Sequence, residues 1–209
     1  MERLDVTSIV LAGGRSMRLG YDKVLQAVGD RSLLEKVLDT VAGLSRSIVV
    51  VAAEGRAIPE LKEYPGVRVV TDLYSGRGPL VGIYTGLLAS TTFRNLVVAS
   101  DMPFLNEGLL RYMVSLSDGY DAVTLRIGDK LEPLHAVYTR ACLGPIERML
   151  EEGELGVHRL LLRIRVRYVV EEEMERFDPE RLSLFNVNTE RDLRMARDIL
   201  AGGGYSDQR

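Results

Sequence analysis

The hydrophobic period of this 209-residue chain changes repeatedly along the sequence, which limits the folds that the chain can adopt. Short runs rich in β-branched residues, such as TSIVLA and SIVVVAA, alternate with longer segments of helical spacing, such as SLLEKVLDTVAGL. The alternation continues through VRVVTD, PLVGIYTGLLAS, NLVVASDM, NEGLLRYMVSL and DAVTL. Strands and helices in this order form parallel sheets through right-handed crossovers, with helices on both faces. The sequence therefore predicts a single α/β domain, Rossmann-like, with a mostly parallel sheet.

Beyond residue 125 the pattern is less regular. EPLHAVYTR predicts a strand, RACLGPIERMLEEG a helix broken near Pro145, and RIRVRYVV another strand. The last strand alternates Arg163, Arg165 and Arg167 with apolar residues. A half-exposed edge strand explains the alternation, because charge at a sheet edge discourages pairing with other chains. The alternative is that these arginines attract an anionic substrate.

The C-terminal segment contains one clear helix signal. TERD resembles a capping box between Thr189 and Asp192, so we expect the last helix to begin there. We expect residues 1–200 to form the whole domain and residues 201–209 to form a flexible tail.

Composition excludes several classes of protein. The formal net charge of -3 argues against a general nucleic-acid binder, which normally carries a basic surface. The single cysteine, Cys142, allows neither an intrachain disulfide nor a cysteine-based zinc cluster. No apolar stretch approaches the roughly 20 residues that span a bilayer. We therefore expect a cytoplasmic protein that binds neither nucleic acid nor membranes.

The loop after the first predicted strand, in VLAGGRSMRLGYDK, concentrates glycine and positive charge. In open parallel sheets, ligands bind beyond the carboxyl ends of the strands, where the strand order reverses. Gly13 and Gly14 would let backbone amides approach a ligand there, and Arg15, Arg18 and Lys23 would add positive charge. This combination predicts a triphosphate-binding loop, with Arg15 the weakest candidate.

Three other structures could contain a glycine-rich loop of this kind. A dinucleotide site would need G-x-G-x-x-G leading directly into a helix, whereas GGRSMRLG is followed by a further irregular stretch. A P-loop would need G-x-x-x-x-G-K-[ST], a register that Lys23 does not fit. A glycine-rich surface turn is the simplest alternative, but the spacing of both glycines, both arginines, Asp22 and Lys23 is more specific than such a turn requires.

Asp101 ends the apolar run NLVVAS and is expected at the same rim of the sheet. Mg²⁺ that arrives with a triphosphate prefers one or two carboxylates together with phosphate oxygens and water. Asp101 is therefore our candidate metal ligand. The alternative is a capping role in the turn that follows, where Asn106 is a second candidate cap.

The pattern LAGG-R-S-x-R-x-G-x-D-K resembles the signature of nucleotidyltransferases, and among them the molybdenum cofactor guanylyltransferases. The similarity extends over almost the whole chain and includes VVTD, GPLVG, ASDMPFL, EPLHAVY and FNVNTERDL, the last being the motif that best separates this subgroup from its relatives. The resemblance implies a nucleotide-diphospho-sugar transferase-like fold. It also implies Mg²⁺-dependent transfer of GMP from GTP to the terminal phosphate of molybdenum-molybdopterin, with pyrophosphate as the second product.

The same resemblance implies roles for individual residues. Asn188, rather than Asn186, would join Asp101 as a ligand of Mg²⁺. Asp72 would contact the guanine or the ribose. The remaining nucleotide contacts would come from the backbone of Leu11, Ala12, Gly13 and Gly14 and from two cations, Arg18 and Lys23, which would neutralise the phosphates. Arg18, Lys23 and Asp101 would together form the catalytic set.

Some features leave alternatives open. Ala52 and Ala53 stand where members of this family often carry an asparagine, so the preference for GTP over CTP is not fixed. A sister nucleotidyltransferase, acting on the cytidylyl form of the cofactor, cobinamide phosphate or a sugar phosphate, would share the same loop. A non-catalytic nucleotide-binding protein is a further alternative.

The remaining expectations concern substrates, partners and the two histidines. GTP and molybdenum-molybdopterin would be the substrates, and transient contact with molybdenum-inserting or acceptor proteins is expected. His135 is expected in the core or the substrate pocket, and His158 at the surface. Gly78 and Gly82 flank either a mobile loop or a tight strand-to-helix turn.

Overall fold

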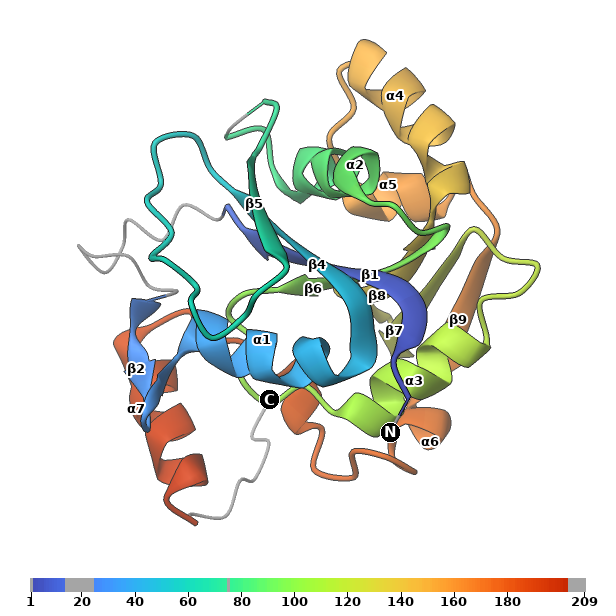
Figure 1. Ribbon diagram of the computed structural model, residues 1–209. Coiled ribbons are helices and arrows are strands. Elements are labelled where there is room, and N and C mark those ends of the chain that lie inside the picture. Colours follow the sequence, from blue (N-terminus) through green and yellow to red (C-terminus); the bar gives the residue numbers. More distant parts are fainter. Residues whose placement is uncertain (1, 14–24, 75, 203–209) are drawn as a thin grey trace.

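The computed structural model describes residues 2–13, 25–74 and 76–202, and its main feature is a seven-stranded sheet in the order β5-β4-β1-β6-β8-β7-β9 (Figure 1). The strands of this sheet are β1 (Leu4–Ala12), β4 (Ser45–Ala52), β5 (Val67–Thr71), β6 (Arg94–Ala99), β7 (Ala122–Ile127), β8 (Lys130–Thr139) and β9 (Val166–Val170). A separate hairpin pairs β2 (Ala27–Val28) with β3 (Arg31–Ser32).

Strand directions confirm the predicted, mostly parallel sheet. β1 pairs in parallel with both β4 and β6, and β4 pairs in parallel with β5. β8 alone is antiparallel, lying between β6 and β7, and β9 pairs in parallel with β7. From β1 the chain first builds outward through β4 to β5 and then returns to the other side of β1 at β6. The strand order therefore reverses at β1, which sets the place where a ligand is expected.

Helices cover both faces of the sheet, as the sequence predicts (Figure 1). The helices are α1 (Leu33–Leu44), α2 (Pro79–Ala89), α3 (Glu107–Ser115), α4 (Leu143–Glu151), α5 (Val157–Leu161), α6 (Glu171–Met174) and α7 (Glu190–Leu200), with short 3₁₀ turns η3 (Arg140–Cys142) and η4 (Leu182–Leu184). Helices α1 and α3 share one apolar core with the sheet, and α2, α4 and α5 share the other. Alternate residues of β4 divide between these cores, Val50 facing the first and Val49 the second.

Local sequence signals explain where several helices begin. Ser32 caps α1 and Thr189 caps α7, each in a capping box with the acidic residue three positions later. The helix expected to break near Pro145 instead begins at Leu143, after the 3₁₀ turn η3. Pro145 therefore lies in the first turn of α4, where its missing N–H removes no helical hydrogen bond.

The three arginines of the predicted final strand take part in ion pairs within the chain, although only Arg167 lies in β9. Arg163 lies 2.6 Å from Glu152, Arg165 lies 2.9 Å from Asp121, and Arg167 contacts Glu173 at 2.5 Å. β9 lies at the edge of the sheet, so the edge-strand interpretation is confirmed for Val166–Val170, whereas Arg163 and Arg165 precede the strand. Across the described residues, no helix combines the length and the apolar character needed to cross a membrane.

Candidate active site

The carboxyl ends of β1 and β6 meet at the point where the strand order reverses. Leu11 is paired with Ala99, and the Ser100 N–H donates a hydrogen bond to the Leu11 carbonyl at 3.1 Å. Gly13 therefore leaves the sheet beside the segment that carries Asp101. Both Gly13 and Asp101 line a cleft of about 850 Å³.

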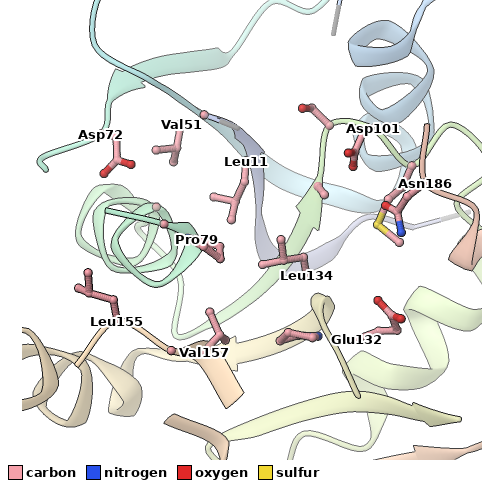
Figure 2. A pocket seen from close by; sticks show the side chains of 18 of the residues that line it. Leu11, Val51, Asp72, Pro79, Asp101, Glu132, Leu134, Leu155, Val157 and Asn186 are labelled. Carbon is pink, nitrogen blue, oxygen red and sulfur yellow. The ribbon is translucent and has the colours of Figure 1, made fainter. Parts of the chain in front are cut away.

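Asp101 lies next to the motif that contains the two asparagines. The Val187 N–H donates to the Asp101 carbonyl at 2.9 Å, and Val187 and Phe185 are buried in a small core that also contains Leu193 of α7. This anchoring brings both Asn186 and Asn188 to the cleft wall. Figure 2 shows the side chains of Asp101 and Asn186 on the same side of the cleft.

Asp72 follows β5 and lies on the other side of Leu11 in Figure 2. Its N–H donates to the Ala52 carbonyl at 2.8 Å, and its Oδ1 accepts a hydrogen bond from the Thr85 hydroxyl of α2 at 3.2 Å. Burial raises the pKa of the Asp72 carboxyl, although the hydrogen bonds from Thr85 and from the Tyr74 backbone act in the opposite direction. A β-carbon added to Gly13 would lie 4.0 Å from Asp72 Oδ2, so the glycine backbone and this carboxylate form one corner of the cleft.

The far part of the cleft is mostly apolar. Its walls come from the start of β8, from the start of α5 and from the loop before α5, and they include Leu131, Glu132, Pro133, Leu134, Leu155, Val157 and His158. Figure 2 shows Leu134 between the Asp101 side of the cleft and the Val157 side. The cleft thus has a polar half at the ends of β1, β5 and β6 and an apolar half beyond it.

The structure brings together only part of the predicted site. Leu11, Gly13, Asp72, Asp101 and Asn188 all line the cleft. Ala12 is fully buried directly behind Gly13, with its carbonyl accepting a hydrogen bond from Arg56. The predictions that concern Gly14, Arg15, Arg18 and Lys23 fall outside the described residues. The roles of all these residues stay predictions.

Arg56 and His158 are among the residues that line the cleft without having been predicted there from the sequence. Arg56 belongs to the loop after β4 and lines the cleft near Gly13. His158 is exposed, as expected, but it also lines the apolar half. The segment EGRAIPE carries no strand or helix signal, so the sequence does not indicate that Arg56 lies at the cleft.

His135 lies in the core rather than at the cleft. It is fully buried on β8, opposite Val98 of β6, and its Nδ1 lies 3.3 Å from the Ser183 carbonyl. Burial lowers the pKa of His135 to about 4. Of the two environments that the sequence left open for this residue, the structure places it in the core.

The residues on the Asp101 side of the cleft are suited to binding a magnesium ion that arrives with a triphosphate. Across residues 2–13, 25–74 and 76–202 there is no cluster of three or more His, Cys, Asp or Glu side chains with metal-binding geometry. Asp101 supplies one carboxylate, and Asn186 and Asn188 supply amide oxygens at the same wall. Mg²⁺ usually binds one or two carboxylates and takes its other ligands from phosphate and water, so this donor set is suitable for it.

Solved structures of similar shape identify the class of protein. Molybdopterin-guanine dinucleotide biosynthesis protein A from Archaeoglobus fulgidus superposes with a TM-score of 0.81 at 29% identity, covering 94% of this chain and 100% of that protein. The 2-C-methyl-D-erythritol 4-phosphate cytidylyltransferase from Thermus thermophilus shares the fold at a TM-score of 0.69 and 16% identity, over 95% of this chain and 100% of that one. The fold is that of the nucleotidyltransferases, with the cleft at its strand-order reversal.

Sequence comparison specifies the family within this class. The model of the MobA-like NTP transferase domain matches residues 8–171. A probable molybdenum cofactor guanylyltransferase from Pelotomaculum thermopropionicum is 39% identical over 194 residues, which cover 93% of both proteins. The chain belongs to the MobA-like NTP transferase family and is a nucleotidyltransferase. The family resemblance inferred from the LAGG and FNVNTERDL motifs is thereby confirmed.

Proposed function

We propose that this nucleotidyltransferase transfers GMP from GTP to the terminal phosphate of molybdenum-molybdopterin. An oxygen of that phosphate attacks the α-phosphorus of GTP, and the bond from the α-phosphorus to the bridging oxygen of the β-phosphate breaks. Pyrophosphate leaves with the electron pair of that bond. The nucleophile is already anionic, so the reaction requires no general base. The name of the Pelotomaculum thermopropionicum relative supports this choice of substrates.

The observation that carries the proposal is the cleft at the reversal point. Gly13 exposes backbone, Asp72 presents a carboxylate, and Asp101 lies beside two asparagines, all around one cavity of about 850 Å³. A nucleotide can occupy the polar half, with its phosphates toward the loop after Gly13. The acceptor would then occupy the apolar half, with its terminal phosphate directed toward the α-phosphorus.

Catalysis in this proposal depends on positioning and charge stabilisation. Bringing two reactants together in the correct orientation can supply roughly 7 to 11 kcal/mol of the barrier reduction. Asp101, with Asn188 as our preferred second ligand, would hold Mg²⁺, which would supply positive charge beside the phosphates. Arg18 and Lys23 would neutralise the β- and γ-phosphates as pyrophosphate leaves.

Substitution of Asp101 tests the proposal. Asp101→Ala should lower Mg²⁺-dependent guanylyl transfer at least about a hundredfold, because it removes the carboxylate that would hold Mg²⁺ beside the reacting phosphates. The matched control is Asp198→Ala, which changes an exposed aspartate of α7 that does not line the cleft. Circular dichroism and thermal unfolding would check that both variants fold.

Release of pyrophosphate, measured with GTP, CTP and ATP in the presence of molybdopterin, distinguishes the open alternatives. Turnover with GTP alone supports the proposal, whereas turnover with CTP would assign the cytidylyl reaction. Absence of turnover with every triphosphate would favour a non-catalytic nucleotide-binding protein. Full turnover by a folded Asp101→Ala variant would rule out the metal-binding role of Asp101.

A further inference from the structure

The chain at the end of β4 carries two alanines, whose side chains form no hydrogen bonds. Ala52 ends β4 and Ala53 follows it. The Ala53 backbone lies close to Gly13, because a β-carbon added to Gly13 would be 3.7 Å from the Ala53 nitrogen. Recognition of a base from this side must therefore come from the backbone or from a neighbouring side chain.

Arg56 reaches this position through a tight turn. The Arg56 N–H donates to the Ala53 carbonyl at 3.0 Å, and Gly55 has a φ of 73°, which favours glycine. The turn directs the chain back toward β1, where Arg56 Nη1 donates a hydrogen bond to the Ala12 carbonyl. The half-buried Arg56 thus lines the cleft beside Gly13 and Asp72. Its guanidinium is anchored to the backbone that precedes the predicted phosphate loop.

A donor and an acceptor therefore lie at the same end of the cleft. A guanidinium carries five N–H donors, so it can bond to Ala12 and to other acceptors at the same time. The Asp72 carboxylate accepts hydrogen bonds. Guanine offers two acceptors, O6 and N7, and also offers the N1 and N2 donors. Adenine and cytosine instead present amino donors at the positions equivalent to O6.

We propose that Arg56 is a specificity-determining residue that donates hydrogen bonds to O6 and N7 of guanine. This inference rests on the proposed use of GTP and assigns the selection of the base to this chain's own arginine. Arg56 would favour guanine because its donors match O6, and it would disfavour adenine and cytosine because their amino groups would face the guanidinium. Asp72 would accept hydrogen bonds from the N1 and N2 donors on the opposite edge of the base or from the ribose hydroxyls.

Calorimetry of nucleotide binding in the presence of Mg²⁺ tests this assignment. The wild-type protein should bind GTP about tenfold more tightly than 7-deaza-GTP, which lacks the N7 acceptor. Arg56→Met should bind the two nucleotides equally, because it removes the donors but keeps an unbranched apolar side chain. Its preference for GTP over ATP should also fall, by about 5- to 150-fold, the range expected for one bidentate contact to guanine.

Arg68→Met is the matched control for the loss of an arginine. Arg68 also donates from its guanidinium to a backbone carbonyl, that of Ala89, but it does not line the cleft. This variant should keep the wild-type ratio of GTP to 7-deaza-GTP affinity. Arg56→Lys adds a second test, since it keeps the positive charge but replaces the rigid, planar guanidinium with a flexible ammonium group. Arg56→Lys should lose most of the preference for GTP over 7-deaza-GTP.

The outcomes separate this inference from the proposed function. If the wild-type protein showed no preference for GTP over CTP and ATP, the proposed function itself would fail. If the preference existed but survived in a folded Arg56→Met variant, only the role of Arg56 would be rejected. An equal loss of affinity for GTP, ATP and CTP would also reject it, because that result would indicate a phosphate contact.

Discussion

Asp72 experiences opposing effects on its carboxyl group. Burial disfavours the ionised form, whereas the Thr85 hydroxyl and the Tyr74 backbone stabilise it, and the pKa is raised because burial outweighs them. When folding raises the pKa of a carboxyl, the protonated form of that carboxyl stabilises the folded state. Its contribution to stability is present below pH about 3.8 and is lost as the pH rises through the folded-state pKa. At neutral pH the ionised Asp72 therefore destabilises the fold.

Asp72→Asn should consequently stabilise the protein at pH 7 while weakening nucleotide binding. We expect Tm to increase by about 1–4 °C at pH 7, and the difference from wild type to shrink as the pH approaches 4. Thermal unfolding at several pH values would measure this difference. A lower Tm for the variant at pH 7 would mean that the hydrogen bonds from Thr85 and Tyr74 outweigh burial.

The individual residues of the site differ in how far their positions follow from the sequence. Gly13 and Asp101 end recognisable strands, so the rules of parallel sheets predict that they meet at one rim, and both line the cleft. Arg56 has no such signal. Its position depends on the turn from Ala53 to Arg56 and on a hydrogen bond to Ala12, both of which require the folded loop.

Helix α2 and strand β1 are packed unusually closely at two glycines, and this contact also fixes part of the cleft. A β-carbon at Gly86 would overlap Ile9 Cγ2 and lie 3.0 Å from Ile9 Cδ1, and one at Gly82 would lie 3.2 Å from Leu11 Cδ2. We expect Gly86→Ala to lower the free energy of unfolding by about 1–3 kcal/mol, since overpacking outweighs the gain in helix propensity. Urea denaturation would measure the change.

The control for this substitution is Gly43→Ala in α1. Gly43 is exposed, and an added β-carbon there would meet nothing within 4 Å. Only the effect of helix propensity remains, so we expect a gain of a few tenths to about 1 kcal/mol. Opposite signs for the two variants would locate the effect in the contact between α2 and β1. Equal gains would show that Ile9 moves aside without a significant cost.

Elements with a strong period or cap were predictable, and short elements were not. The capping box predicted at Thr189 and the apolar strands of the parallel half are confirmed. Helices α5 and α6 have only 5 and 4 residues, too few for a helical period to emerge. The direction of β8 was not predicted, because a strand has the same sequence pattern whichever way it runs.

At the scale of the whole molecule, the position of the cleft follows from chain order. The strand order reverses at β1, and the crevice of an open sheet lies at such a reversal. The apolar half of the cleft was not predictable, because it needs β8 and α5 to converge from segments with irregular patterns. The domain boundary at residue 200 stays a prediction.

His135 links the stability of the whole fold to pH. Its ring is fully buried, and the nearby Ser183 carbonyl and Asp178 carboxylate only partly offset the effect of burial, which lowers the pKa of His135 to about 4. The unfolded chain should titrate near 6.5. A histidine with a lowered folded-state pKa contributes stability above pH 6.5, and that contribution is lost as the pH falls toward 4.

His135→Gln should therefore make stability less sensitive to acid. Between pH 7 and pH 5 the wild-type protein should lose about 2 kcal/mol more unfolding free energy than this variant, because protonation of the unfolded histidine draws the equilibrium toward unfolding. Urea denaturation at the two pH values would measure the difference. His158→Gln changes the exposed histidine and should leave the wild-type dependence intact. An unchanged dependence in His135→Gln would mean that the folded protein accommodates a protonated ring between β8 and Ser183, contrary to the burial found there.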